Sequence, residues 1–152
     1  MDIIKYTPAF RARCIVIFKS NQPKFFAEEE LQLFADFLDH DIDDNYYLIQ
    51  EEGEVVGCGG IFLDQQSDEV GLSWGMVHAD FHKKGIGKAL TLFRLDVMKH
   101  QFPDRTYKVD TSQFTAGFYK GLGFDTIAIV PNGFAKGLDK YVMKMTPPKD
   151  MP

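Results

Sequence analysis

The sequence predicts an α+β fold, an α/β sandwich in which helices pack on one mixed, mostly antiparallel central sheet. Short segments rich in β-branched and aromatic residues are bounded by turn residues, as in strands, and longer segments repeat apolar residues every three or four positions, as in helices. These segments follow one another in the order β-α-α-β-β-β-α-β-α-β-β. We expect a single domain over residues 1–146 and a mobile tail over 147–152, because 152 residues suffice for one core and are too few for two.

The first half of the chain predicts two helices and a three-stranded meander. Thr7 and Pro8 suit a helix start, because proline is tolerated at the first helical position. Glu28–Glu30 would occupy the first turn of the second helix, where carboxylates are favoured by the helix dipole. We expect the acidic segment Asp39–Asp44 to be a loop. The expected elements are a strand at Ile3–Tyr6, helices at 8–20 and 28–38, and strands at 46–50, 55–63 and 69–77.

Glycines mark the irregular positions of the second half. Gly71 and Gly75, inside the third strand of the meander, predict a β-bulge or a close backbone approach. Ser112 is expected to cap a short helix that Gly121 and Gly123 end. The remaining elements are a long helix at 87–99, a strand at 106–110, and a final antiparallel pair at 126–130 and 140–145, joined across a glycine-containing connection.

Composition narrows the classes of partner and compartment. A net charge of -5 and a pI of about 5.3 argue against nucleic acid and mildly favour a cationic ligand such as an amine. The sequence has no apolar run long enough for a membrane span and no basic, apolar start typical of a signal peptide. Cys14 and Cys58 have neither the spacing of a metal site nor that of a disulfide framework. We therefore expect a cytoplasmic protein without a bound metal or a membrane partner.

A glycine turn between a strand and a helix is the first motif that carries chemistry. His82–Gly87 reads H-K-K-G-I-G and leads into an amphipathic helix, an arrangement that directs backbone N–H groups and a positive helix end toward one small volume. That is a suitable site for a pyrophosphate. A Walker A loop is excluded because His82 and Ala89 stand where glycine and Ser or Thr are needed, and a Rossmann fingerprint because Leu90 replaces its third glycine.

A second motif follows about thirty residues later. Phe118–Phe124 reads F-Y-K-G-L-G-F, which places the phenol of Tyr119 on a short helix near a glycine stop. In this order and spacing, the two motifs resemble the GNAT family of N-acetyltransferases, which move an acetyl group from acetyl-CoA to an amine. The architecture matches over nearly the whole chain, and the specific motifs lie within residues 75–124.

The resemblance implies a binding site for acetyl-CoA as co-substrate. In relatives, the glycine loop holds the pyrophosphate, and the strand before it bulges and pairs with the pantetheine arm. His82 stands where the family has Gln or Arg, and Ser112 and Thr115 stand where it often has Asn and Ala. The expected CoA-binding residues are Gly75, Met76, Val77, His78, His82, Lys83, Lys84, Gly85, Ile86, Gly87, Lys88 and Ser112.

The resemblance also implies catalytic roles. Tyr119 would donate a proton to the CoA thiolate as it leaves. Glu69 is a candidate general base, because Glu69, Gly71, Ser73 and Gly75 alternate on one strand face and relatives often carry Glu where this chain has Gly71. His78 is a second candidate base, and Trp74 with Phe25 and Phe26 would line the acceptor end.

The sequence therefore predicts an N-acetyltransferase that acts on a small-molecule or peptide amine by direct attack in a ternary complex. Two alternatives stay open. One is a non-catalytic module that senses acyl-CoA, and the other is an acyltransferase with a different acyl donor or a hydroxyl acceptor. Neither the acceptor nor the choice between a monomer and a homodimer follows from the sequence.

Overall fold

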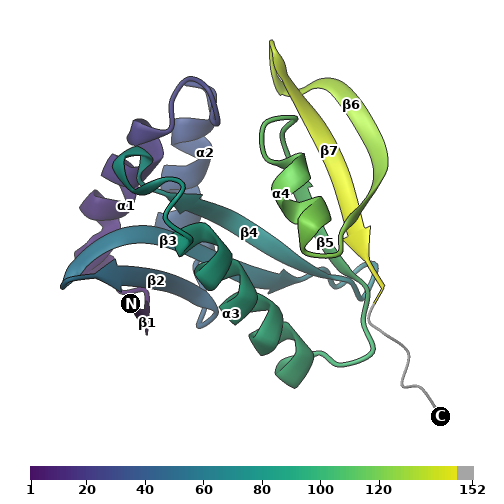
Figure 1. Ribbon diagram of the computed structural model, residues 1–152, viewed down its shortest axis with the longest axis horizontal. Coiled ribbons are helices and arrows are strands. Elements are labelled where there is room, and N and C mark those ends of the chain that lie inside the picture. Colours follow the sequence, from purple (N-terminus) through teal and green to yellow (C-terminus); the bar gives the residue numbers. More distant parts are fainter. Residues whose placement is uncertain (147–152) are drawn as a thin grey trace.

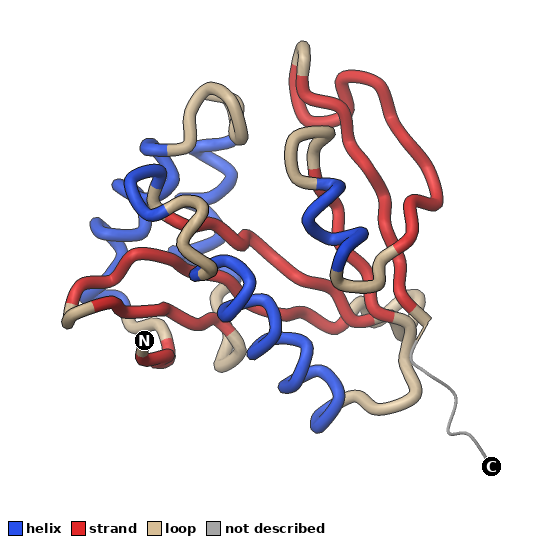
Figure 2. Tube along the Cα trace, in the orientation of Figure 1, coloured by secondary structure: helices blue, strands red, loops and turns tan. Residues whose placement is uncertain are grey.

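A computed structural model describes residues 1–146 of the chain; the tail predicted for 147–152 lies outside the described residues. Seven strands form one open sheet in the order β1-β2-β3-β4-β5-β7-β6 (Figures 1 and 2). Only β4 and β5 run parallel, so the sheet is mixed and mostly antiparallel, as predicted. The strands are β1 (Asp2–Lys5), β2 (Tyr46–Glu51), β3 (Glu54–Leu63), β4 (Val70–Val77), β5 (Tyr107–Thr111), β6 (Asp125–Ala135) and β7 (Leu138–Met145).

Helices cover both faces of the sheet. Helices α1 (Arg11–Ser20) and α2 (Glu30–Asp36) lie on one face, and α3 (Ile86–Gln101) lies on the other, on the same side as the short α4 (Ala116–Gly121) (Figure 1). Short helical turns at Pro8–Phe10, Phe37–Asp41 and Ala79–Phe81 complete the described chain. No helix within residues 1–146 is long and apolar enough to cross a membrane.

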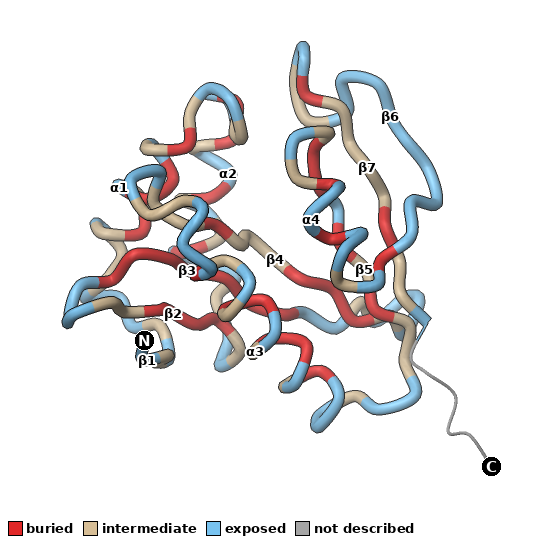
Figure 3. The backbone as a smooth tube through the Cα atoms, in the orientation of Figure 1, coloured by how far each residue is buried: buried red, intermediate tan, exposed pale blue. Residues whose placement is uncertain are grey.

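Strand alternation divides the core between the two faces. Tyr46 and Leu48 of β2 pack toward α1 and α2, whereas Tyr47 and Ile49 pack toward α3, because successive strand side chains point to opposite faces. Figure 3 shows the buried backbone following β2, β3 and the sheet side of α3. Both faces of these strands are therefore covered, and the sheet positions α3 rigidly against β3 and β4.

The predicted bulge is present in β4. Cys58 pairs with Met76 and Gly60 with Ser73, so Trp74 and Gly75 together oppose the single residue Gly59. Trp74 has a φ of 41°, a left-handed conformation that is uncommon for a residue with a side chain. The bulge corrects one expectation. A Cβ at Gly71 would meet the Phe62 ring, but one at Gly75 would meet Arg94 of α3, so Gly75 does not share the face of Gly71.

Several helix and strand boundaries in the structure differ from the predicted ones. The second helix begins at Glu30, not Glu28, and a π-helical turn at Phe37–Asp41 replaces the start of the expected acidic loop. Arg11 fixes that turn through two hydrogen bonds to Asp39. The last two strands run on to a tight turn after Ala135. Their pairing is irregular between Val130 and Ala135, the segment that contains Pro131 and Gly133, and resumes at Ala135–Leu138.

The Ser112 cap was predicted wrongly. Helix α4 starts at Ala116, with Thr115 before it and no side-chain cap. The Ser112 hydroxyl instead accepts a hydrogen bond from the Phe114 amide, and its carbonyl accepts from the amides of Thr115 and Ala116. Ser112 therefore stabilises the turn that precedes the helix.

We expect Gly60→Ala to lower the free energy of unfolding by about 1–3 kcal/mol, the usual range for overpacking. A Cβ there would lie 2.5 Å from the backbone oxygen of Asn45 and 2.7 Å from the Tyr46 ring, and the backbone atom cannot move aside. Gly117→Ala is the control, because its Cβ meets nothing within 4 Å in a helix and should stabilise by up to ~1 kcal/mol. Urea unfolding measures both; equal stability of Gly60→Ala and wild type would contradict the contact.

Candidate active site

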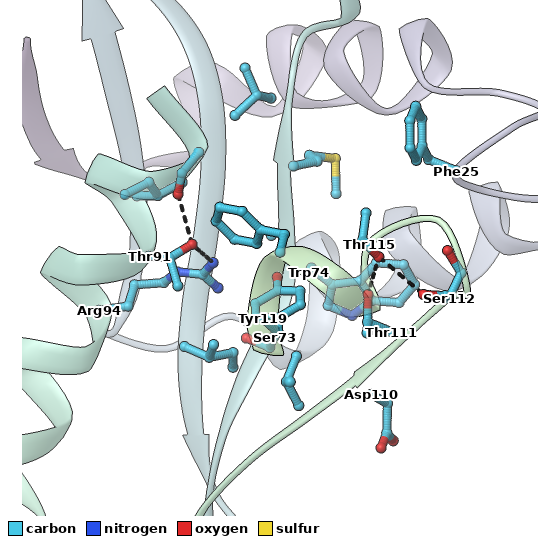
Figure 4. A pocket seen from close by; sticks show the side chains of 18 of the residues that line it. Phe25, Ser73, Trp74, Thr91, Arg94, Asp110, Thr111, Ser112, Thr115 and Tyr119 are labelled. Carbon is cyan, nitrogen blue, oxygen red and sulfur yellow. Dashed lines mark hydrogen bonds between the residues drawn. The ribbon is translucent and has the colours of Figure 1, made fainter. Parts of the chain in front are cut away.

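The main cleft opens where β4 and β5 separate. These strands pair only at Val70–Tyr107 and Gly71–Lys108, and beyond these pairs no strand within residues 1–146 continues along this edge of β4. The resulting cavity has a volume of about 1070 Å³ and is lined by side chains from both faces of the sheet. Figure 4 shows Arg94 reaching it from α3, Tyr119 from α4, and Phe25 from the segment that follows α1.

The glycine turn forms one end of this cleft. Gly85 adopts a φ of 78° and precedes the first residue of α3, which leaves the first-turn amides without partners inside the helix. A Cβ at Gly85 would meet nothing within 4 Å, and one at Gly87 only Val77 Cγ2 at 3.6 Å, so the space before these amides is open. Lys83 and Lys88 line the cleft beside the turn. Positive charge, free N–H groups and open space fit the pyrophosphate of CoA.

The His82 ring is directed toward the preceding strand. Its Nε2 lies 2.8 Å from the Val77 carbonyl oxygen, which also accepts a hydrogen bond of 3.0 Å from Asn21 Nδ2. The ring edge also packs on Phe25, with centroids 5.4 Å apart. His82 therefore ties the loop to β4, and the contact with phosphate that the sequence suggested would have to come from its other ring nitrogen.

The predicted CoA-binding residues fall into two groups. Three do not line the cleft. The His78 ring accepts a hydrogen bond from the Asp80 amide, the Lys84 ammonium lies 5.1 Å from the centre of the Phe81 ring, and the Ile86 side chain is buried against the sheet. The other nine line the cavity. Ser112 follows β5, and the rest come from β4, the glycine turn and the start of α3: Gly75, Met76, Val77, His82, Lys83, Gly85, Gly87 and Lys88.

Tyr119 lies on α4 and faces the cleft, as Figure 4 shows. Its ring is buried and packs edge-on against Phe118 and Phe124, with centroids 5.1 and 5.9 Å apart. Thr111 and Thr115 hydrogen-bond to each other at the start of the same turn. The phenol is thus held in one orientation at the open edge of β4, where it can act as a proton donor.

Glu69 also lines the cleft, but its environment does not suit a general base. Its carboxylate forms a 2.6 Å ion pair with Lys144 and lies 3.7 Å from Lys108. The Lys144 ammonium lowers the pKa of Glu69, which makes it a weaker proton acceptor. It also lies just before the first residue of β4, at the end where β4 still pairs with β5 and away from the bulge.

Glu30 is a carboxylate that sequence reasoning passed over. It stands first in α2 and lines the cleft, yet it is only 7% exposed. One oxygen, Oε1, accepts a 3.0 Å hydrogen bond from the Ala27 amide. Burial raises the pKa of Glu30, as is common for groups that exchange protons with a substrate. The sequence shows three consecutive glutamates, and nothing in that run distinguishes the one that faces inward.

Aromatic rings build the wall near Glu30. Trp74 packs against Phe34 and Phe37, with centroids 5.2 and 6.2 Å apart, and Phe26 stacks on Phe18 at 4.7 Å. Phe25, Phe26 and Trp74, which the sequence suggested for the acceptor end, all line the cleft. No group of three His, Cys, Asp or Glu side chains within residues 1–146 is arranged to hold a metal ion.

Comparison with known proteins agrees with this geometry. The family model described as the acetyltransferase (GNAT) family matches residues 12–124. No curated protein matches the chain significantly.

Solved structures share the fold at low sequence identity. Ard1 from Thermoplasma volcanium is 18% identical, with a TM-score of 0.77, over 97% of this chain and 98% of that one. An aminoglycoside 6'-N-acetyltransferase complexed with coenzyme A is 14% identical, with a TM-score of 0.74, over 99% and 100%. The ribosomal-protein-alanine N-acetyltransferase from Brucella melitensis is 14% identical, with a TM-score of 0.73, over 96% and 99%. Because the family model covers most of the chain, including both motifs of the cleft, this protein belongs to the acetyltransferase (GNAT) family.

Proposed function

We propose that this enzyme transfers an acetyl group from acetyl-CoA to a primary amine by direct attack in a ternary complex. The observation that carries the proposal is the cleft at the separation of β4 and β5, which is lined from both sheet faces. The glycine turn and α3 supply a pyrophosphate site on one side, and Glu30 with its aromatic wall supplies an amine site on the other. The donor and the acceptor can therefore meet at the open edge of β4.

The cleft residues account for the movement of each proton. The acceptor reaches the cleft as an ammonium, and Glu30 takes one proton to release the amine. The amine nitrogen then bonds to the thioester carbonyl carbon, and the carbon–sulfur bond breaks with its electron pair passing to sulfur. Tyr119 donates a hydrogen bond or its proton to that sulfur, and the second proton of the new amide nitrogen leaves to solvent.

Direct attack is favoured because neither cysteine can carry the acetyl group. Cys14 and Cys58 are both fully buried, and neither lines the cleft. The hydrogen bond to Cys58, together with burial, raises the pKa of Cys14, so its reactive thiolate form is disfavoured. We place the protein in the cytoplasm, where acetyl-CoA is available and unpaired cysteines persist.

The acceptor class follows from the chemistry of the amine site. A buried carboxylate in a cleft that Trp74 and Phe26 also line suits an ammonium on a partly apolar group, either a small molecule or a peptide N-terminus. The names of the structural relatives include both kinds, an aminoglycoside acetyltransferase and a ribosomal-protein-alanine acetyltransferase. An acetylation screen that covers aminoglycosides, polyamines, amino acids and peptide N-termini would identify the acceptor.

CoA and acetyl-CoA should raise the melting temperature of the wild type. A ligand at about 100 times its Kd stabilises the folded state by about 2.7 kcal/mol. Gly87→Glu should abolish the shift, because it places a carboxylate at the first turn of α3, where the phosphates would bind. Gly87→Ala is the matched control and should keep most of the shift, since its Cβ meets only Val77 Cγ2 at 3.6 Å. An undiminished shift in folded Gly87→Glu would place CoA elsewhere.

Tyr119→Phe should lower kcat by roughly ten- to a thousand-fold, at or below the lower part of the hundred- to ten-thousand-fold range of general acid–base catalysis. The ring still packs against Phe118 and Phe124, so acetyl-CoA affinity and stability should change little. Tyr141→Phe is the control, because Tyr141 packs on the core outside the cleft lining. Single-turnover kinetics measure the chemical step; an equal rate in Tyr119→Phe and Tyr141→Phe would remove Tyr119 from the reaction.

Glu30→Gln should lower kcat/KM by roughly a hundred- to ten-thousand-fold, the contribution expected of a general base. Glutamine keeps an acceptor oxygen for the Ala27 amide, so the start of α2 survives. Because burial raises the pKa of Glu30, wild-type activity should fall with decreasing pH at a midpoint above the usual value of about 4.3 for Glu. This fall in activity at low pH should be absent in Glu30→Gln, whose pH profile should show only the ionisation of the acceptor amine. Glu29→Gln, a change at an exposed neighbour, is the control and should leave kcat/KM unchanged. If kcat/KM fell strongly in Glu69→Gln and not in Glu30→Gln, Glu69 would be the general base.

A further inference from the structure

Arg94 is a buried cation that forms no ion pair with a carboxylate within residues 1–146. It projects from α3 under the sheet, is 2% exposed and lines the cleft. Nη1 donates to the Gly60 carbonyl at 3.2 Å and Nη2 to the Thr91 hydroxyl at 3.3 Å, both long bonds. Nε has no hydrogen-bond partner among the described residues. An uncompensated buried charge is strongly unfavourable, so its presence calls for an anion at some stage of function.

The nearby carboxylates do not supply that anion. Among the acidic residues of the cleft lining, Glu30 accepts a hydrogen bond from the Ala27 amide, Glu69 pairs with Lys144, and Asp110 lies 3.7 Å from Lys140. The titratable groups that face this region are Tyr46 from β2 and Tyr119 from α4. Burial raises the pKa of Tyr46, so it supplies no negative charge near neutral pH. The described part of the chain thus offers no compensating anion, and a bound ligand could supply one.

Glycines place the guanidinium directly beneath the β4 bulge. A Cβ at Gly75 would lie 2.6 Å from Nη2, and one at Gly59 would lie 3.0 Å from Cζ, so any side chain at either position would displace the cation. Thr91, which receives the Nη2 bond, is itself anchored on the Gly87 carbonyl at 2.7 Å. The position of the charge under Gly75 is thus fixed by the fold.

The guanidinium lies at the bulge and not in the open space before the glycine turn. No Arg94 atom comes within 4 Å of a Cβ at Gly85 or Gly87, whereas a Cβ at Gly75 would lie 2.6 Å from Nη2. In the proposed binding mode, the pantetheine arm starts at the glycine turn and runs back along β4, passing Val77 before Gly75. Its sulfur end therefore reaches the bulge, between Arg94 and Tyr119, which both point into the cleft there (Figure 4).

Resting on the proposed function, we propose that Arg94 stabilises the negative charge that the reaction places on the CoA sulfur. The breaking carbon–sulfur bond leaves its electron pair on sulfur, and a fixed cation in a water-poor site favours that charge without reorganisation. Tyr119 donates a hydrogen bond to the sulfur, and the positive charge of Arg94 stabilises the sulfur electrostatically. The unpaired guanidinium is then matched by an anion only while thiolate is present.

The experiment titrates the thiol of CoA bound to the enzyme by its thiolate absorbance. A unit charge several ångströms away, at an effective dielectric constant of about 20, should lower the pKa of bound CoA by about one to two units from the thiol value of about 8.5. Arg94→Met, of similar shape and without charge, should restore the free value, and Arg94→Lys should keep most of the shift. Lys99→Met, an exposed change on the same helix, is the control.

Two further readouts separate this role from a structural one. Arg94→Met should lower kcat by about ten- to a hundred-fold with little change in KM for acetyl-CoA, and its melting temperature should not fall, because an uncompensated buried charge is removed. An unshifted thiol in wild type, or a shift that persists in Arg94→Met, would overturn the inference. So would a preference for succinyl-CoA over butyryl-CoA that Arg94→Met abolishes, which would assign Arg94 to a substrate carboxylate.

The wild-type protein distinguishes failure of this inference from failure of the proposed function. If CoA does not bind at all, both fall. If CoA binds and acetyl transfer proceeds but the bound thiol titrates like free CoA, only the role of Arg94 falls. Should Arg94→Met not fold, the wild-type titration and Arg94→Lys still decide the question.

Discussion

The bulge at Trp74–Gly75 is the constraint on which the rest of the site depends. A left-handed conformation at a residue with a side chain costs of order 1–3 kcal/mol, so surrounding contacts must hold it. The Trp74 carbonyl accepts a 2.8 Å hydrogen bond from the Tyr46 hydroxyl, and its ring is packed against several phenylalanines on α1, α2 and the turn after α2. These contacts offset the strain, and the twist of the bulge is accompanied by the separation of β4 from β5. The open edge of β4 therefore depends on the aromatic cluster that packs around Trp74.

The bulge also explains how β4 contributes residues to both faces of the sheet within the cleft. Before the bulge, Gly71 faces Phe62, on the face that α1 and α2 cover; after it, Gly75 faces α3 and Arg94. A regular strand would place Gly71 and Gly75 on the same side. By reversing the alternation, the bulge brings the α3 side, with its loop and cation, and the α1–α2 side, with its carboxylate and aromatic rings, to the same opening. The two substrates of a transfer reaction need such a shared opening.

Much of the fold and of the cleft could be predicted from the sequence. The features that could not be predicted depend on contacts that residue type alone does not reveal. The order of elements, the glycine turn and the bulge follow from local signals: periodicity, turn residues, and glycines at positions where backbone must approach closely. The extra π-helical turn at Phe37–Asp41 is held by a contact between distant segments, that of Arg11 with Asp39. The extension of β6 and β7, and the turn that Ser112 stabilises before α4, depend on backbone hydrogen bonds that residue type does not reveal. The same division holds within the site. His82 could be recognised as a departure in the loop, but its bond to Val77 could not.

Charge assignment shows most clearly why residue type alone was insufficient. Glu69 and Glu30 are the same residue, and only the fold separates them: two lysines hold the first as a carboxylate, whereas burial makes the second a better proton acceptor. In the sequence, Arg94 is one polar residue of the long helix. Its guanidinium can be buried under the sheet because Gly59 of β3 and Gly75 of β4 leave room for it. In this cleft, the acidic and basic groups near the paired end of β4 neutralise one another. Beneath the bulge, Arg94 has no ion-pair partner within residues 1–146, an arrangement suited to a reaction in which negative charge develops.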